Sequence, residues 1–379
     1  MWQSLHDAWW RLATQHHPQS FKGTLASSAL QAGAVAYGAA AALRNTAYDQ
    51  GWVKPVRLPC GVVSVGNLTV GGTGKTACVE LVASKLLARG RRVAILSRGY
   101  GGSAAPYWLR WQDGGLRVDG AADAKSRQLA DEPQLLARRL PGTPVVVGAR
   151  RDRSGHLACE TLGADVAILD DGFQHRRLAR DCDIVLVHAG MPFSGWALLP
   201  RGPMREPLTA LRRAHVIIAT KADEALSTVG ALLERLRTFN PGADLLTASH
   251  EPTALIDGAT GEPQPLARLA GARVGLLSSI GDPSGFEATV SRLQASVAWH
   301  RTFPDHHPYR EEDWTRIAEW ARGSRPNAIV TTEKDWTRLS RLMSHVSCLA
   351  VPLWVLGVRM KILDGEALLD ARLAGVRAR

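Results

Sequence analysis

The sequence predicts an α/β protein in which a doubly wound parallel sheet is followed by a second, smaller α/β domain. The first observation behind this prediction is a series of short apolar runs with room for a helix after each, which is typical of parallel strands buried on both faces. These runs cover residues 61–65, 92–96, 145–147, 166–169, 184–187 and 216–219. The second is a glycine-rich turn that joins the first run to a helical pattern. The third is that the pattern begins anew near residue 224, with helices expected at 225–239 and 311–321 and strands at 274–278 and 328–331.

The composition limits the class of protein. A chain of 379 residues is long enough for two domains, and 45% hydrophobic against 21% charged residues is typical of a globular protein. The formal net charge of +11 favours an anionic partner. Charge alone does not choose among nucleic acid, phosphorylated lipid and an acidic membrane surface, but nucleic acid has no recognisable binding module in its favour. The five cysteines form no CxxC pair and no His/Cys metal pattern, which predicts a reducing compartment and no structural zinc.

The first 50 residues predict a helical segment associated with a membrane. Residues 25–43, between Lys22 and Arg44, carry no charge over nearly the ~20 residues needed to span a bilayer. The run is rich in alanine and glycine, so it is far less hydrophobic than a leucine-rich span. We therefore expect a helix in or against the membrane interface, anchored by the preceding tryptophans and by basic flanks. The alternative is an ordinary small-residue helix packed on the core.

The glycine-rich turn TVGGTGKT predicts a phosphate-binding loop. Its glycines permit positive φ angles and let backbone N–H groups approach an anion, and the following helix adds the partial positive charge of its N-terminus. The lysine can reach the β- and γ-phosphates, and the last threonine can bind Mg²⁺. The loop departs from the pattern GxxxxGK[ST] only at its first position. The residues predicted to bind the nucleotide are Thr69, Val70, Gly71, Gly72, Thr73, Gly74, Lys75 and Thr76.

Polar residues after the other strands are expected at the same edge of the sheet, because ligands bind beyond the carboxyl ends of parallel strands. Asp170 and Asp171 follow the run 166–169, and two adjacent carboxylates are costly without a cation nearby, so we expect a magnesium site there. Arg98 follows the run 92–96. Asp131 opens a helix, where aspartate is also a common N-cap.

Two further stretches leave alternatives open. Thr220-Lys221-Ala222-Asp223 resembles the base-reading motif of GTPases, but four residues are a weak signal. In the second domain, Asp305-His306-His307 puts a carboxylate beside two histidines in a loop. Neighbouring residues rarely all face one ion, so a zinc site is disfavoured against a general-base helper or a structural histidine.

Taken in order, the segments SVGNLTVGGTGKT, LSRGYGG, DEPQLLA, LDDGFQH, GPMREP, FPDHHPY and TTEKD resemble the tetraacyldisaccharide 4'-kinase (lipid A 4'-kinase) family of Gram-negative bacteria, over nearly the whole chain. The family's loop also resembles this one at Thr69. The resemblance implies a P-loop NTPase-like nucleotide-binding core, a smaller lid-like domain and an N-terminal helix at the cytoplasmic face of the inner membrane. It also implies a lipid kinase that transfers the γ-phosphate of ATP to the 4'-hydroxyl of tetraacyldisaccharide 1-phosphate, an anionic glycolipid, to form lipid IVA in lipopolysaccharide biosynthesis. Residues 278–283 match the family pattern only in part. This partial match affects only the substrate contacts that the resemblance implies for the second domain.

The resemblance implies a role for each candidate residue. Lys75 and the loop amides would hold the β- and γ-phosphates of ATP. Asp131 is the candidate base for the sugar hydroxyl, assisted by His306, and Asp170 would serve either metal or substrate. The implied ligands of Mg²⁺ are Thr76, Asp171, Glu206 and Gln174. The implied ligands of substrate phosphates are Arg98 and Arg205, with the cluster Arg150, Arg151 and Arg153 as a further candidate or as solvated surface.

These expectations divide the chain into a membrane-associated segment (1–50), a P-loop core (51–223), a smaller lid or substrate domain (224–357) and a C-terminal helix (358–379). No obligate protein partner is inferred. The main rival hypothesis is a GTPase or ATPase of the metallochaperone and carrier type, although that class usually carries a second lysine where this loop has Val70. A third hypothesis, a membrane-binding module without enzymatic activity, predicts that Lys75→Ala leaves function intact.

Overall fold

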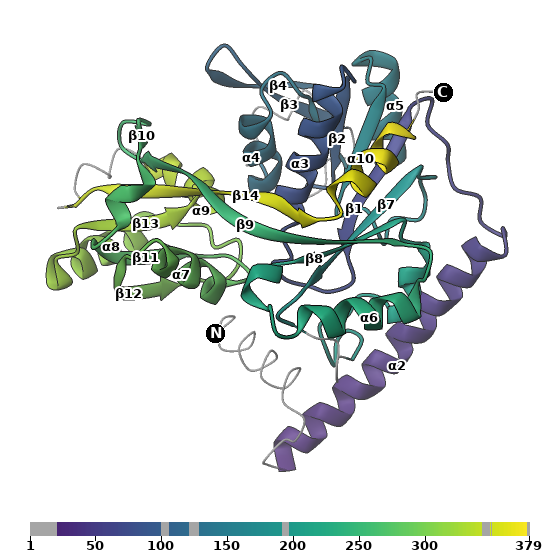
Figure 1. Ribbon diagram of the computed structural model, residues 1–379, viewed down its shortest axis with the longest axis horizontal. Coiled ribbons are helices and arrows are strands. Elements are labelled where there is room, and N and C mark those ends of the chain that lie inside the picture. Colours follow the sequence, from purple (N-terminus) through teal and green to yellow (C-terminus); the bar gives the residue numbers. More distant parts are fainter. Residues whose placement is uncertain are drawn as a thin grey trace. The chain divides into compact units, whose positions relative to one another are not determined.

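The computed structural model describes residues 21–99, 106–120, 129–191, 197–342, 349 and 351–376 (Figure 1). The chain forms two compact units. Unit 1 contains residues 1–128, 136–249 and 361–379, and unit 2 contains residues 129–135 and 250–360. The tryptophans before residue 25 and residues 100–102 of the LSRGYGG segment lie outside the described residues.

In the sheet of unit 1, the first strand, β1 (Gly61–Asn67), has further strands on both of its sides. It pairs in parallel with β6 (Val166–Asp170) on one side and with β7 (Cys182–His188) on the other. Beyond β6 come β2 (Val93–Ser97) and β5 (Val145–Val147), and beyond β7 come β8 (Val216–Thr220) and the first part of β9 (Asp244–Asp257), all parallel. An antiparallel hairpin, β3 (Tyr107–Gln112) and β4 (Gly115–Gly120), follows β5. This order is that of a doubly wound sheet, so the predicted fold class is confirmed.

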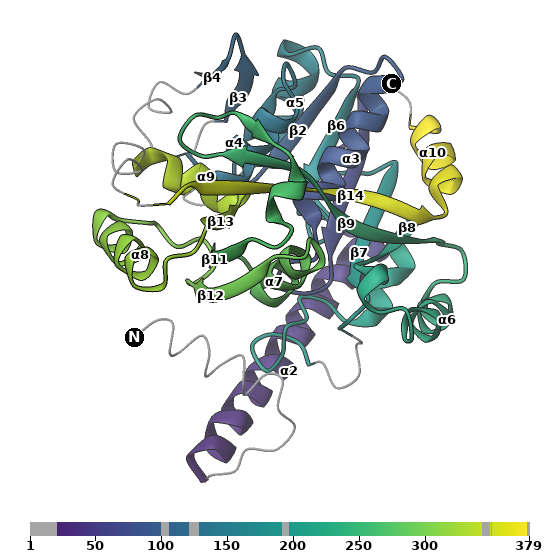
Figure 2. The same ribbon diagram turned by 60° about the vertical axis from the view of Figure 1, so that its left-hand side comes forward.

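The middle strands are continuous apolar runs because both of their faces are covered. Every residue of β1, β2, β5, β6 and β8 is buried. Burying a valine or leucine side chain contributes roughly 1.5–3 kcal/mol, so these runs carry much of the stability of the unit. The helix α3 (Lys75–Ala88) packs on β1 and β6 (Figure 2). Unit 1 also contains α5 (Arg151–His156) and α6 (Val229–Phe239), and α4 (Asp131–Arg139) is divided between the units after residue 135.

Unit 2 is a smaller α/β unit with its own core. Its parallel strands run in the order β12 (Ser296–Thr302), β11 (Arg273–Ser278), β13 (Ala328–Thr332) and the first part of β14 (Leu353–Asp364). The short β10 (Pro263–Gln264) pairs with the end of β9. Its helices are α7 (Pro283–Arg292), α8 (Glu311–Ser324) and α9 (Glu333–Leu339). The strands predicted at 274–278 and 328–331 and the helix predicted at 311–321 are therefore present.

Two predicted boundaries differ from the structure. Residues 358–379 are not one helix, because β14 continues to Asp364 and α10 (Glu366–Ala374) begins only after Gly365. Met360 and Ile362 are buried while Lys361 and Leu363 are exposed, and this period of two is that of a strand. The second domain was expected from residue 224, whereas residues up to 249 belong to unit 1. α6 lies within this unit, and the first part of β9 extends its sheet beside β8.

The predicted N-terminal helix is present as α2 (Phe21–Asp49), which is partly buried and partly exposed. One stripe packs on the protein: Ala34 and Ala41 are buried, and a Cβ on Gly38 would lie 2.9 Å from Leu198. Elsewhere the helix is exposed, and Val35 and Leu43 keep 64% and 67% of their surface accessible. Within the described part of the chain, no helix combines the length and the hydrophobicity needed to cross a bilayer.

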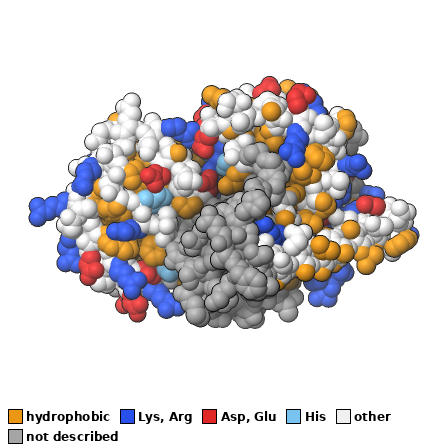
Figure 3. All heavy atoms as spheres, turned by 90° about the horizontal axis from the view of Figure 1, so that it is seen from below, with side chains coloured by type: hydrophobic (Ala, Val, Ile, Leu, Met, Phe, Trp, Pro, Cys, Tyr) orange, Lys and Arg blue, Asp and Glu red, His pale blue; other side chains and the backbone are white. Residues whose placement is uncertain are grey.

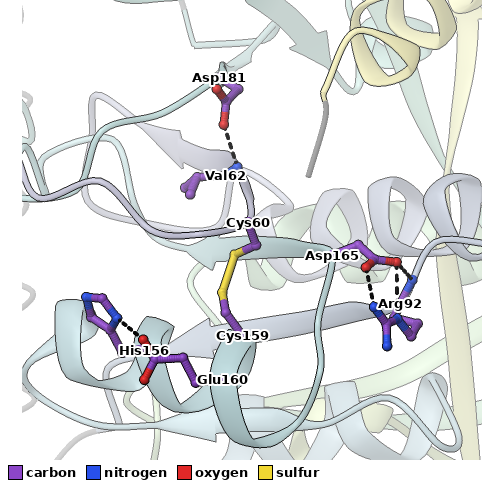
Figure 4. The surroundings of a disulfide bond; sticks show 8 residues. All are labelled: Cys60, Val62, Arg92, His156, Cys159, Glu160, Asp165 and Asp181. Atoms are coloured by element: carbon purple, nitrogen blue, oxygen red, sulfur yellow. Dashed lines mark hydrogen bonds and ion pairs between the residues drawn. A yellow bond between two sulfur atoms is a disulfide. The ribbon is translucent and has the colours of Figure 1, made fainter. Parts of the chain in front are cut away.

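A disulfide joins Cys60, just before β1, to Cys159, in the π-helical turn η2 (Leu157–Thr161) after α5 (Figure 4). The two Cα atoms are 6.2 Å apart although the residues are 99 positions apart in the sequence. The scattered cysteines predicted free thiols in a reducing compartment. The spacing of cysteines in the sequence could not show that Cys60 and Cys159 are close in the fold. Cys78 and Cys182 are free and buried, and burial raises the pKa of each to about 12.

Candidate active site

In unit 1 the predicted polar residues gather at the carboxyl ends of three neighbouring strands. β1 ends at Asn67, β6 at Asp170 and β2 at Ser97, and the three strands are parallel. The Ser97 hydroxyl donates to Oδ2 of Asp170 at 3.3 Å. This is the edge at which an open α/β sheet binds its ligands.

The predicted phosphate-binding loop forms the turn between β1 and α3. Gly71 and Gly74 have φ angles of 111° and 85°, which only glycine adopts at little cost, and α3 begins directly at Lys75. The N–H of Val70 is already used, because it donates to Pro203 O at 2.8 Å. Gly71 and Gly72 are exposed, so the part of the loop from Gly71 onward is the part that an anion can reach.

Asn67 organises this loop, and sequence reasoning gave it no role. Its side chain is fully buried, donates to the Thr73 hydroxyl at 2.8 Å and accepts from Lys75 Nζ at 3.3 Å. Its backbone carbonyl accepts from the Gln174 amide at 2.8 Å. The signal that could have found it was its place, since it is the last residue of the strand that precedes the loop.

The two adjacent aspartates lie in different surroundings. Asp170 is buried at the end of β6, and its carbonyl accepts from the buried Arg151 at 2.9 Å. Asp171 turns away with a φ of 53°, receives two hydrogen bonds from Arg205 at 2.7 and 2.9 Å, and lies 3.8 Å from Lys75 Nζ. Burial alone would raise the pKa of Asp171, but the charges of Lys75 and Arg205 outweigh it and lower that pKa. Asp171 is therefore a carboxylate at neutral pH, facing the loop lysine.

The oxygens expected to hold Mg²⁺ fit such an ion in their chemistry. The Gln174 Oε1 atom is buried and has no hydrogen-bond partner in the structure, while its Nε2 is fixed on Asn67. Hydroxyl, carboxylate and amide oxygens are the hard ligands that Mg²⁺ prefers, and Mg²⁺ usually keeps several waters. Among the described residues no group of three or more His, Cys, Asp or Glu side chains could hold a metal. A site at this edge would thus combine Thr76, Asp171 and Gln174 with water.

A metal-ligand role for Glu206 does not fit this arrangement. Its side chain has no exposed surface, and its two oxygens are bound by Arg44 of α2 and by Arg213 at 2.5 Å. The resemblance to the kinase family implied Glu206 as a ligand of Mg²⁺. Its partners are two guanidinium groups, and that of Arg44 is 162 positions away in the chain.

The arginines predicted to bind phosphate groups lie in three different surroundings. Arg205 holds Asp171, and its backbone N–H donates to Leu68 O at 2.7 Å, which ties its loop to the phosphate-binding loop. Arg98 is exposed directly after β2. In the arginine cluster, Arg153 is exposed, Arg150 pairs with Asp152 at 2.7 Å, and Arg151 is buried against Asp170, so the solvated alternative fails for Arg151.

Asp131 and His306 lie close together in unit 2, although Asp131 was expected in the P-loop core. Asp131 begins α4 and lies in the part of that helix that belongs to unit 2. The Nδ1 atom of His306 lies 3.7 Å from Asp131 Oδ2. His306 has a φ of 61°, in a turn where His307 N donates to Pro304 O. His307 is the structural histidine of the pair, because its Nε2 lies 2.9 Å from Asp313 and its ring stacks on Phe303.

The chain is similar to proteins of one family over nearly its whole length. Residues 26–376 match the model of a protein family described as Tetraacyldisaccharide-1-P 4'-kinase. The chain is similar to proteins named tetraacyldisaccharide 4'-kinase from Anaeromyxobacter sp. (strain K), at 44% identity over 98% of this chain and 96% of the relative, and from Geobacter sulfurreducens, at 37% identity over 95% and 98%. It is also similar to the crystal structure of LpxK from Aquifex aeolicus in complex with ATP, with a TM-score of 0.69 and 31% identity over 93% of this chain and 99% of that one.

Proposed function

This chain belongs to the tetraacyldisaccharide-1-P 4'-kinase family, and we propose how its residues divide the work of that family's reaction. The reaction transfers the γ-phosphate of ATP to the 4'-hydroxyl of tetraacyldisaccharide 1-phosphate in lipid A biosynthesis. Phosphoryl transfer requires the two oxygens to be placed in line, the negative charge of the phosphates to be neutralised, and the hydroxyl proton to be accepted. Each requirement has a candidate in the described residues.

The nucleotide end of the reaction is assigned to the loop after β1. Lys75 begins α3 and is held by Asn67 at 3.3 Å, so its ammonium group is fixed at a helix N-terminus beside exposed glycines. A fixed cation and oriented N–H groups neutralise phosphate charge without reorganisation during the reaction. This pairing of Lys75 with Asn67 and Asp171 is the observation that carries the proposal.

Magnesium is assigned to the oxygens of Thr76, Asp171 and Gln174. The buried Oε1 of Gln174 without a partner and the ionised Asp171 support this assignment. These residues would hold the ion, which would supply positive charge to neutralise that of the phosphate groups. Asp171 would have to share its oxygens with the ion, since Arg205 binds both of them in this structure. Asp170, buried on Ser97 and Arg151, would keep Asp171 in place rather than bind substrate.

The acceptor end is assigned to unit 2. Asp131 would accept the proton of the 4'-hydroxyl, and His306, 3.7 Å from it, would orient the carboxylate and share the proton. Arg98, exposed after β2, is the candidate partner for a phosphate group of the anionic glycolipid. Arg205 forms an ion pair with Asp171, so we assign it to the nucleotide part of the site and not to the glycolipid.

Association with the cytoplasmic face of the inner membrane is proposed for α2. The helix leaves Val35 and Leu43 exposed, and Trp52, three residues after its end, is 70% exposed. Figure 3 shows the molecule from below, with hydrophobic side chains at the surface among those of Lys and Arg. An apolar helix surface on a protein of net charge +11 suits an anionic leaflet that contains an anionic glycolipid.

The test is phosphate transfer from γ-labelled ATP to tetraacyldisaccharide 1-phosphate in detergent micelles with Mg²⁺. We expect label on the lipid for the wild type and a loss of at least about 100-fold for Lys75→Ala, because the lysine neutralises charge that develops in the transition state. Label released only as free phosphate, or GTP used better than ATP, would favour the rival NTPase hypothesis. Unchanged turnover of Lys75→Ala would favour a membrane-binding module.

A further inference from the structure

A buried arginine of unit 2 contacts the proposed base and has no part in the assignments above. The Nε atom of Arg338 lies 3.3 Å from Asp131 Oδ2, and the Arg338 side chain keeps only 4% of its surface exposed. The other contact of this carboxylate with a cation is looser, 3.9 Å from Oδ1 to the more exposed Arg341. Burying a guanidinium costs free energy unless its charge is paired and its N–H groups are hydrogen-bonded. The partners of Arg338 must therefore be identified.

The side chain of Arg338 is fixed by a second buried charge. Its NH2 group donates to Asp335 Oδ1 at 2.9 Å and to Ser279 O at 3.3 Å, and its NH1 group donates to His307 O at 3.3 Å. The two terminal nitrogens of the guanidinium therefore both have partners, while the buried Nε makes no hydrogen bond and lies 3.3 Å from Asp131 Oδ2 as an ion pair. Such a fork has one orientation, which a flexible lysine would not keep.

Asp335 is itself held by a full set of donors. It is completely buried and accepts from the backbone N–H and hydroxyl of Ser279 at 3.0 and 2.6 Å, from the Tyr309 hydroxyl at 3.2 Å and from the Thr332 hydroxyl at 2.7 Å. Burial, together with the charge of Asp335, raises the pKa of Tyr309, so that phenol stays a donor. A carboxylate with this many donors is a rigid anchor.

The helix α9 carries both charges and also holds the residue after Asp131. Thr332 caps α9 through the N–H of Asp335 at 3.1 Å, which sets the start of the helix. One turn separates Lys334 from Arg338, so they lie on the same side of α9. Lys334 lies 3.2 Å from Glu132 while Arg338 reaches Asp131. Two cations of one short helix thus fix the first two residues of α4.

We propose that Arg338, oriented by Asp335, is a positioning residue that holds Oδ2 of Asp131 and thereby aims Oδ1 at the acceptor hydroxyl. The inference rests on the proposed role of Asp131 as the base. Arg338 does not touch the substrate in this scheme and acts only through the carboxylate that it orients. Displacement of a reacting group by about 1 Å can cost roughly 100-fold in rate, and this sets the expected effect.

The experiment measures kcat and the KM for ATP in the micelle assay for Arg338→Gln, Arg338→Lys, Asp131→Asn and the double variant Asp131→Asn with Arg338→Gln. We expect Arg338→Gln to lower kcat about 100-fold with an unchanged KM for ATP, and Arg338→Lys to recover part of the loss because it restores the charge without the fork. The double variant should be no slower than Asp131→Asn alone, because two groups that act as a unit are not additive. Arg359→Gln is the matched control, since it removes the ion pair of Arg359 with Glu333 on the same helix.

Three outcomes would overturn the inference. Arg338→Gln could keep wild-type kcat while Asp131→Asn loses it, or the double variant could show the product of the two losses, or Arg359→Gln could lose as much as Arg338→Gln. Full turnover of Asp131→Asn would instead remove the proposed base, and the inference with it. Thermal unfolding and ATP binding of each variant show whether it is folded, and Arg338→Lys supplies the comparison if Arg338→Gln is not.

Discussion

At the residue scale, Asn67 shows that a side chain without reactive chemistry can decide the shape of a nucleotide site. It links Thr73 and Lys75 by its side chain and Gln174 by its carbonyl. We predict that Asn67→Ala raises the KM for ATP about tenfold or more, since two hydrogen bonds of about 1 kcal/mol each are lost and Lys75 is no longer fixed. ATP kinetics and binding measure this.

Asn240→Ala is the matched control for that variant. Asn240 is also buried in unit 1, and its amide donates to Leu211 O and Ala214 O at 2.8 Å. Its loss should lower the free energy of unfolding while the KM for ATP stays unchanged. An equal rise in KM for both variants would mean that general destabilisation, and not the loop, explains the effect of Asn67→Ala.

The lowered pKa of His175 predicts that the free energy of unfolding depends on pH. Burial, followed by the charges of Arg151 and Arg180, lowers its pKa to about 4 from an ordinary value of 6.5. Between these values the unfolded chain binds a proton that the folded chain does not, so the free energy of unfolding falls as the pH falls from 6.5 to 4. The expected loss at pH 4 is about 3 kcal/mol for this group.

Urea unfolding of wild type and of His175→Gln at pH 7, 5.5 and 4.5 tests this. The difference between the two proteins should shrink or change sign as the pH falls, because glutamine has no proton to bind. A constant difference across this range would contradict a depressed pKa of His175. Acidic groups titrate in both proteins, and they cancel in the comparison.

Residue identity in the sequence revealed those parts of the site whose chemistry is local. Lys75 and Asp171 were found because a lysine after glycines and an aspartate after a buried strand have a recognisable task, and the structure puts them 3.8 Å apart. Asn67 and Arg338 were not found, because their task depends on neighbours that are distant in the chain. For the same reason, nothing near Glu206 in the sequence indicates that Arg44 binds it in this structure.

At the element scale, α2 is tied to the loop that carries Arg205. The Tyr37 hydroxyl donates to Arg205 O at 2.9 Å, and Arg44 binds the buried Glu206 next to it. We predict that Arg44→Ala lowers the free energy of unfolding by about 1–3 kcal/mol, because Glu206 keeps Arg213 but loses one of its two charged partners while still buried. It should also reduce ATP turnover, since Arg205 holds Asp171.

Chemical denaturation and ATP kinetics of Arg44→Ala measure both effects. The control is Arg237→Ala, which removes an exposed ion pair with Glu234 on α6. Exposed pairs contribute little, so this variant should match the wild type. Wild-type stability of Arg44→Ala would show that α2 is not anchored through Glu206.

Whether a strand could be predicted depended on how regular its pattern of apolar residues is in the sequence. The strands of unit 1 were predicted because they are buried on both faces and so read as continuous apolar runs. The hairpin of β3 and β4, with exposed and charged residues, gives no such run. The long strands β9 and β14 were missed because each changes its environment where the chain passes from one unit to the other, so no single period covers them.

At the scale of the whole molecule, membrane binding combines two features that no single element explains. The exposed Val35 and Leu43 are eight positions apart on α2 and thus share one side of the helix. The net charge of +11 adds a longer-range attraction to anionic lipid, which falls with salt because the Debye length shortens from ~10 Å at 0.1 M to ~3 Å at 1 M. The two features therefore predict binding with an apolar part that resists salt and an electrostatic part that does not.

Sedimentation with vesicles of anionic and of zwitterionic lipid separates the two parts. We predict that the wild type binds anionic vesicles more strongly, that 1 M salt weakens this preference, and that the double variant Val35→Asp with Leu43→Asp loses most binding to both. Both side chains are exposed, so the variant should unfold like the wild type. Leu226→Asp, at a position 78% exposed outside α2, is the control and should bind normally. If the double variant binds as the wild type does, α2 is not the membrane contact, and the attraction is that of the basic surface alone.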